Sequence, residues 1–235
     1  MFNFLSIYFL VSALLLAYLS YRFAIIKSDH FRLYGVGLGF ISLAQFCALA
    51  VSMLWIVPFI NPNSLYGVSL VFALLAFLSS VVSFLPDKIR KLSDIFLVFC
   101  ASIVAGIYII NPILSGPTIY ELRYIFSFDN SMSMNSFGLA FALAMGLATL
   151  SVAREIKNPS LRFITEFLGL IVIVCLTINM ISTSNALRLT AGAVLSISLV
   201  ALAVSCNRLK LSVALKSKPS SHPKPKPKQK AKSKR

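Results

Sequence analysis

Seven long apolar runs constrain this chain more than any other feature of its sequence. Each run has about 20 residues, the length that an α-helix needs to cross about 30 Å of hydrocarbon. In lipid, the backbone of such a segment has to satisfy its own polar groups, which a helix does. The runs do not alternate polar and apolar residues as the strands of a membrane barrel would. The expected spans are about 2–26, 34–57, 65–85, 92–110, 135–153, 163–183 and 187–206.

The composition agrees with an integral membrane protein. Hydrophobic residues make up 58% of the chain and charged residues only 12%, against about 45–50% and about 25% in soluble domains. The net charge of +15 is uneven, because eleven of the 22 Lys and Arg lie from Arg208 onward, where Asp and Glu are missing. We predict an all-α fold with two parts: a polytopic bundle of seven transmembrane helices (1–207) and a disordered Lys/Pro-rich tail (208–235).

Basic residues occupy alternate connections between the predicted spans. Positive charge gathers on the cytoplasmic side of membrane proteins, so we expect the N-terminus outside, the C-terminus in the cytoplasm and a multi-pass position in the cell membrane. The richer side holds nine basic residues, in three connections, and the other side holds two. The nine are Arg22, Lys27, Arg32, Lys88, Arg90, Lys91, Arg154, Lys157 and Arg162, and the two are Arg123 and Arg188.

The first span is expected to be a retained anchor. Positive charge follows its apolar core instead of preceding it, which differs from a cleaved signal peptide. The chain contains no N-x-S/T glycosylation sequon, since Asn158 is followed by proline. That absence favours a prokaryotic source.

The sequence offers no constellation for catalysis or for a cofactor. Its two histidines, His30 and His222, fall in a predicted cytoplasmic loop and in the tail, so the spans supply no histidine ligand for haem. The last span has no lysine to hold retinal. The deep interiors of the spans carry no ionisable residue, and Glu166, near the end of its span, is expected to pair with Arg162 one turn earlier. We therefore expect neither an enzyme nor a proton pump.

Two amides are the polar groups predicted at depth. Gln45 falls near the middle of the second span and Asn179 in the outer half of the sixth. Buried amides commonly form hydrogen bonds between helices and hold a bundle together. The alternative is that Gln45 and Asn179 line a small polar cavity for an uncharged ligand.

Small residues at four-residue spacing indicate close helix packing. Gly35 and Gly39 form one such seam, and Gly138, Ala142 and Gly146 form another. Seams of this kind let two backbones approach closely. They serve contacts within the bundle, or else a membrane-protein partner or a second copy of the chain.

The longest predicted loop faces outward, between residues 111 and 134. Its aromatic and charged residues Tyr120, Glu121, Arg123 and Tyr124 are typical of the headgroup layer, where a short helix can lie along the surface. The sharper hypothesis is a ligand-contacting element over the outer mouth of the bundle, because long loops often carry function.

The tail mixes prolines with lysines and cannot form a packed core. Tethered at the membrane, it is expected to bind anionic lipid headgroups, at about 1 kcal/mol per basic residue near the surface, or a partner. It lacks aromatics for base stacking, so we do not expect it to read nucleic acid. Its basic residues are Lys216, Lys218, Lys224, Lys226, Lys228, Lys230, Lys232, Lys234 and Arg235.

Together these features favour a non-enzymatic membrane protein that acts as an accessory subunit, scaffold or sensor through helix packing and its basic tail. The alternative is a carrier or channel for a small neutral or apolar solute, which would use Gln45 and Asn179. The seams and the lack of catalytic groups favour the first hypothesis.

Overall fold

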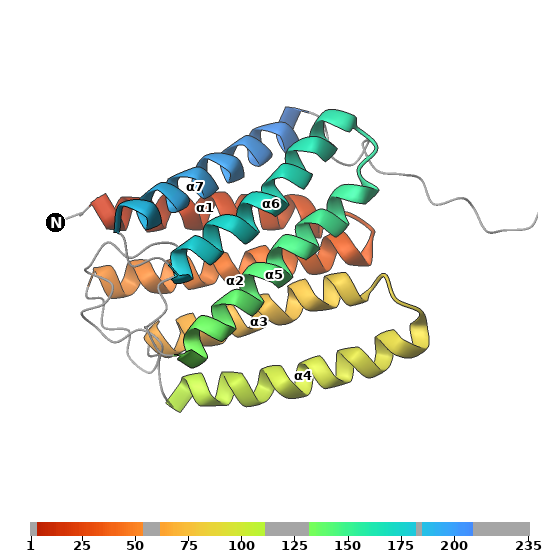
Figure 1. Ribbon diagram of the computed structural model, residues 1–235, viewed down its shortest axis with the longest axis horizontal. Coiled ribbons are helices and arrows are strands. Elements are labelled where there is room, and N and C mark those ends of the chain that lie inside the picture. The colour runs from red at the N-terminus through yellow and green to blue at the C-terminus, as the bar shows by residue number, and fades with distance from the viewer. Residues whose placement is uncertain (1–3, 54–61, 111–131, 182–184, 209–235) are drawn as a thin grey trace, which may run out of the picture.

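Seven α-helices make up the part of the chain that the computed structural model describes, residues 4–53, 62–110, 132–181 and 185–208 (Figure 1). The secondary structure within those ranges is helical, without strands, which confirms the all-α part of the predicted fold class. The helices are α1 (Phe4–Ala24), α2 (Asp29–Ser52), α3 (Pro62–Val82), α4 (Asp87–Ile110), α5 (Met132–Glu155), α6 (Pro159–Ile181) and α7 (Asn185–Arg208).

Six of these helices are long and apolar enough to cross a membrane, which supports a multi-pass membrane protein. They are all but α4. Helix α4 has 24 residues, but its described part begins with a charged segment that contains Lys88, Arg90, Lys91 and Asp94. Charge at one end of a helix is expected where the helix meets the headgroup layer.

Prolines and an Asn cap define several helix starts. Asn158 caps α6, because its Oδ1 accepts the backbone N–H groups of Ser160 at 3.0 Å and Leu161 at 3.2 Å, and Pro159 takes the first helical position. Pro86 stands before α4, and its carbonyl accepts the N–H groups of Ile89 and Arg90. Proline is tolerated at such positions because N–H groups in the first turn have no partner within the helix. The N–H that proline lacks therefore costs no helical hydrogen bond.

The second helix begins five residues earlier than the sequence predicts. The expected span starts at residue 34, whereas α2 starts at Asp29. The apolar run marks only the part of a helix that suits hydrocarbon, and the helix continues through Asp29, His30 and Arg32 toward water. His30 therefore lies in the first turn of α2, and its predicted place in a loop is wrong.

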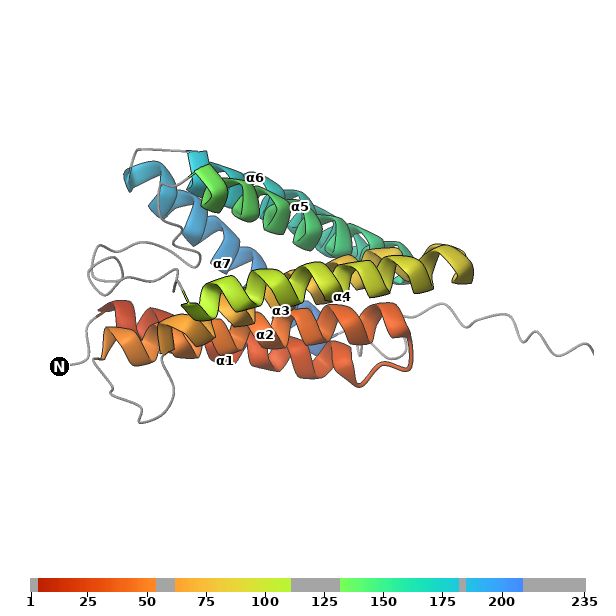
Figure 2. The same ribbon diagram turned by 90° about the horizontal axis from the view of Figure 1, so that it is seen from below.

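The helices form two layers that close into a ring. Helices α1 to α4 lie side by side in one layer, and α5 to α7 form a second layer inclined to it (Figure 2). Contacts of α3 with α5 and of α1 with α7 join the layers, so six helices surround one core. Helix α4 lies outside this ring, and among the described helices its backbone packs against α3 alone.

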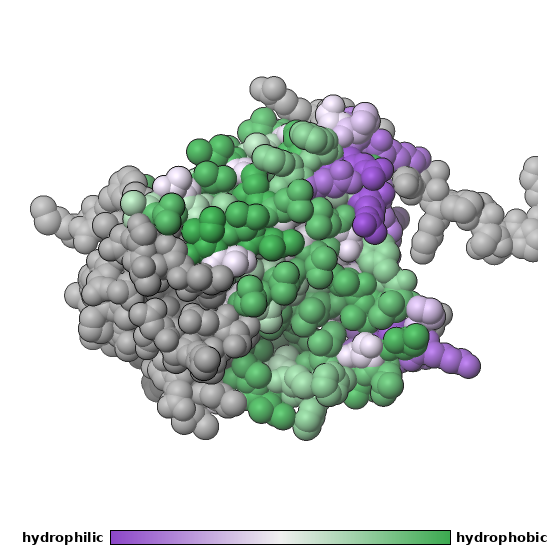
Figure 3. Space-filling view, in the orientation of Figure 1, coloured by the Kyte–Doolittle hydropathy of each residue, from purple (hydrophilic) through white to green (hydrophobic). Residues whose placement is uncertain are grey.

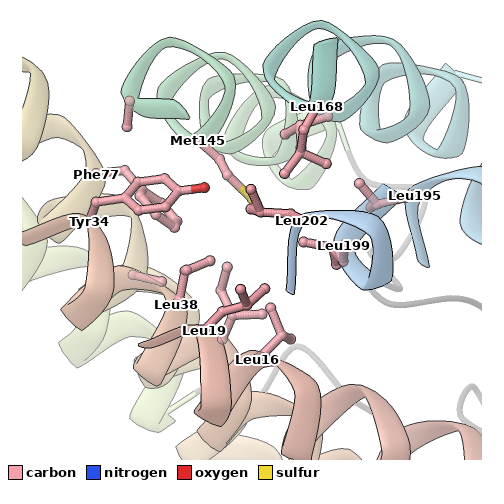
Figure 4. Packing of buried hydrophobic residues seen from close by; sticks show 14 of the residues in the cluster. Leu16, Leu19, Tyr34, Leu38, Phe77, Met145, Leu168, Leu195, Leu199 and Leu202 are labelled. Carbon is pink, nitrogen blue, oxygen red and sulfur yellow. The ribbon is translucent and has the colours of Figure 1, made fainter. Parts of the chain in front are cut away.

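Bulky apolar side chains fill the space between the two layers. Leu16, Leu19 and Leu38 from the first layer face Met145, Leu168 and the α7 leucines from the second (Figure 4). Beside them runs an aromatic chain, in which ring centroids lie 5.6 Å apart for Tyr34 and Phe77 and 6.0 Å apart for Phe77 and Phe141. In lipid, the hydrophobic effect does not drive helices together. Close packing of side chains such as these therefore holds the bundle together.

Candidate functional site

Polar side chains gather at one end of the bundle. We call it the tail-side end: it holds connections 25–28, 83–86 and 156–158 and the C-terminal end of α7. Figure 3 shows hydrophilic residues concentrated at this end and a hydrophobic surface over most of the remaining described part in that view. Exposed cations here include Lys27, Arg32, Lys88, Lys91, Arg154 and Lys157.

His30 joins three helices at this end. Its Nδ1 forms a hydrogen bond with Oγ of Ser83, directly after α3. Its Nε2 lies 3.6 Å from Oε1 of Glu155, the last residue of α5. The imidazole also stacks on the ring of Phe84, with centroids 3.9 Å apart and planes 9° apart. One side chain of α2 thus holds the ends of α3 and α5.

The hydrogen-bond directions in this cluster follow from counting protons. The Ser83 hydroxyl has one proton and donates it to the carbonyl of Ser80 at 2.5 Å, so Nδ1 of His30 donates to Ser83. The second ring nitrogen then faces the Glu155 carboxylate. When Nε2 is also protonated, His30 is a cation and its contact with this carboxylate is an ion pair. The Ser80 hydroxyl in turn donates to the His30 carbonyl at 3.0 Å.

Two further ion clusters lie at the tail-side end. Arg90 of α4 lies 3.7 Å from Oδ2 of Asp29 and 3.8 Å from Oδ2 of Asp94, so it links α4 to the start of α2. On α6, Arg162 Nε donates to Glu166 Oε1 at 2.8 Å, the pairing that their spacing predicts. These pairs are partly exposed, and such ion pairs contribute about 0–1 kcal/mol each.

Arg22 closes the ring between the first and last helices. Its Nη2 donates to the carbonyl of Cys206 in the last turn of α7 at 2.8 Å, and its Nη1 donates to the Tyr18 hydroxyl at 3.2 Å. A cation suits the C-terminal turn of a helix, where backbone carbonyls lack helical partners. Arg22 thereby fixes the end of α7, two residues before Arg208.

The predicted polar pair is only partly visible. Gln45 is fully buried in α2, and the side chain of Asn179 lies outside the described residues. A different buried polar contact links the layers: Thr149 donates to the Met145 carbonyl at 2.7 Å, so the Tyr34 hydroxyl donates to Thr149 Oγ1, at 3.0 Å. The sequence does not mark this pair, because Tyr and Thr are common in membrane helices.

Both predicted seams lie at helix contacts within the chain. A Cβ added at Gly35 would lie 2.7 Å from the Ala24 nitrogen and 2.9 Å from the Ser20 oxygen of α1, and one at Gly39 would meet Ser20 Oγ at 2.9 Å. Gly146 of α5 packs in the same way against Gly169 of α6. Gly138 and Ala142 are buried on α5. Gly169 belongs to the seam although no four-residue repeat marks it.

The remaining predicted site residues fall outside the described residues. They are the loop residues Tyr120, Glu121, Arg123 and Tyr124 and the tail residues Lys216, Lys218, Lys224, Lys226, Lys228, Lys230, Lys232, Lys234 and Arg235. The four cysteines Cys47, Cys100, Cys175 and Cys206 are free thiols within helices.

The described residues contain no group of three or more His, Cys, Asp or Glu side chains that could hold a metal ion. Comparison with protein-family models, with curated proteins and with solved structures gives no match. The function therefore has to be inferred from the geometry of this chain. In the part of the chain that the structure describes, polar contacts between helices gather at the tail-side end.

Proposed function

We propose that this chain is a non-enzymatic protein of the cell membrane, an accessory subunit, scaffold or sensor whose tail-side end binds a partner. The observation that carries this proposal is the distribution of polar groups. His30, Arg90 and Arg22 connect six helices at that end, whereas the space between the layers is filled with apolar side chains. Such an arrangement suits a rigid cytoplasmic face better than a path for solute.

The tail adds to this face. It follows α7, whose last turn is held by Arg22, and its basic residues would add to the exposed cations Lys27, Lys88 and Lys91 of the tail-side end. Attraction to anionic headgroups, at about 1 kcal/mol per basic residue near the surface, would keep the tail close to the membrane and to a partner bound there.

Seven spans with the N-terminus outside complete the proposal. Helix α4 packs along α3, and the basic connections share one end with the C-terminal end of α7 (Figure 1). If α4 did not cross the membrane, loop 111–131 would be cytoplasmic and the tail would lie outside.

Labelling of single cysteines in the full chain tests this topology. The four native cysteines are replaced by alanine, and Ser115→Cys or Ser233→Cys is added. We expect a membrane-impermeant maleimide to label Ser115→Cys in intact cells, and Ser233→Cys only after permeabilisation, because charged reagents do not cross hydrocarbon. Labelling at position 233 in intact cells, with none at 115, would contradict seven spans.

Co-purification tests the partner. The tagged full chain is extracted from its native membranes in mild detergent, and bound proteins are quantified by mass spectrometry. We expect a stoichiometric partner that is lost when Lys27, Arg32 and Lys157 are changed to glutamate, because charge repulsion then replaces complementarity at the tail-side end. The matched control reverses Arg123 and Arg188, on the opposite predicted side, and should keep the partner. A lone monomer, or equal loss in both variants, would refute the proposal.

A further inference from the structure

An apolar groove runs between α3 and α4 in the half of the bundle nearest the tail-side end. It has a volume of about 490 Å³ and is lined by Leu78 and Val82 of α3 and by Leu92, Ser93, Phe96 and Leu97 of α4. Five of these six residues have hydrocarbon side chains. The groove exists because the backbone of α4 packs against α3 alone and α4 lies outside the six-helix ring, so no third described helix fills the space between them.

The groove begins where the basic segment of α4 ends. Asp87 to Lys91 form the charged start of α4, and the lining residues begin at Leu92. Side chains four residues apart lie on one face of a helix, which places Lys88 in line with Leu92 and Phe96. In a membrane this is the boundary between headgroups and acyl chains, with cations on one side of it and the groove on the other.

The cations at this boundary differ in whether they form ion pairs. Arg90 is held by Asp29 and Asp94. Lys88 and Lys91 are exposed and form no ion pair with any side chain that the structure describes. Their charges therefore remain available to an anion that approaches from the headgroup layer.

We propose that this groove binds an anionic phospholipid, with one acyl chain between α3 and α4 and the phosphate at Lys88 and Lys91. The volume lies in the range of small-molecule sites, about 300–1,000 Å³. A second helix, about 10 Å wide with its side chains, would not fit between two helices that remain in contact. Ser93 is the polar lining residue, one turn inside the cations, and its hydroxyl can donate to an ester carbonyl of the lipid.

Tryptophan quenching by brominated lipids tests this proposal in the full chain. Phe96→Trp reports on the groove in a Trp55→Phe background, and Phe99→Trp, an exposed α4 position that does not line the groove, is the matched control. In vesicles of phosphatidylcholine and phosphatidylglycerol, we expect brominated phosphatidylglycerol to quench the Phe96→Trp variant beyond its bulk fraction. The Phe99→Trp variant should sense only the bulk lipid. Because both variants carry the same tail, lipid bound by the tail affects them equally.

The headgroup contact is tested by removing one lysine at a time from the Phe96→Trp variant. Lys88→Gln should lower the preference of its indole for the anionic lipid about fivefold, the effect of one cation near the surface. Lys157→Gln removes an equally exposed cation at another connection and should leave that preference unchanged. Equal quenching by both brominated lipids, or an unchanged preference in Lys88→Gln, would overturn the proposal.

Native mass spectrometry of the delipidated wild-type chain gives the same comparison without a variant in the groove. We expect one phosphatidylglycerol to be retained at collision energies that strip phosphatidylcholine. The Ser93→Phe variant, which narrows the groove, should lose that lipid. Equal retention of the two lipids by the wild type, or undiminished retention by Ser93→Phe, would overturn the proposal.

Discussion

Replacing Gly35 with alanine is expected to lower the free energy of unfolding by about 1–3 kcal/mol, the usual cost of overpacking a close-packed site. The new Cβ would lie 2.7 Å from the backbone nitrogen of Ala24 and 2.9 Å from the backbone oxygen of Ser20. Neither atom can rotate away, so α1 and α2 have to separate. Their separation would also stretch the hydrogen bond from Ser20 Oγ to the Gly35 carbonyl, now 2.7 Å.

The matched control is Gly106→Ala, because an added Cβ there meets no atom within 4 Å. Alanine is a better helix former than glycine by up to about 1 kcal/mol, so the control should be neutral or stabilising. Reversible unfolding of both variants in mixed detergent micelles measures the two free energies. If Gly35→Ala proved as stable as Gly106→Ala, the close approach of α1 and α2 would be wrong.

The fold could be predicted because few backbone structures are stable in the hydrocarbon core of a membrane. A run of about 20 apolar residues in lipid is a helix, and its position in the sequence is plain. Helix ends were less predictable, since hydropathy marks where a helix leaves hydrocarbon and not where its hydrogen bonds stop. For this reason α2 begins at Asp29, before the predicted span, and His30 belongs to a helix.

The cluster of His30, Ser83 and Glu155 at the tail-side end could not be predicted from the sequence. His30, Ser83 and Glu155 are 53 and 72 residues apart along the chain, and none belongs to a motif. Histidine near a membrane surface is ordinary until the pairing of helices is known. The glycine seams differ, because small residues at four-residue spacing mark a packing face, although the sequence does not say which helix lies against it.

The His30→Ala variant is expected to lose about 1–3 kcal/mol of unfolding free energy, the usual cost of breaking a partly buried hydrogen-bond and packing cluster. The substitution removes the donor to Ser83, the contact with Glu155 and the stack on Phe84 together. Solvent screening reduces the share of the ion pair, since the side chains of His30 and Glu155 are 18% and 34% exposed. Most of the loss should therefore come from Ser83 and Phe84.

The other histidine of the chain supplies the control. His222→Ala makes the same chemical change in the tail and should leave the unfolding free energy within about 0.5 kcal/mol of the wild type, as distant surface substitutions do. Hydrogen exchange locates the effect: in His30→Ala, amides of the last turn of α5, which ends at Glu155, should exchange faster while those around Gly35 keep their protection. Uniform loosening of all helices would show that His30 acts on overall stability, whereas acceleration confined to the α3 and α5 ends would identify it as the group that holds them to α2.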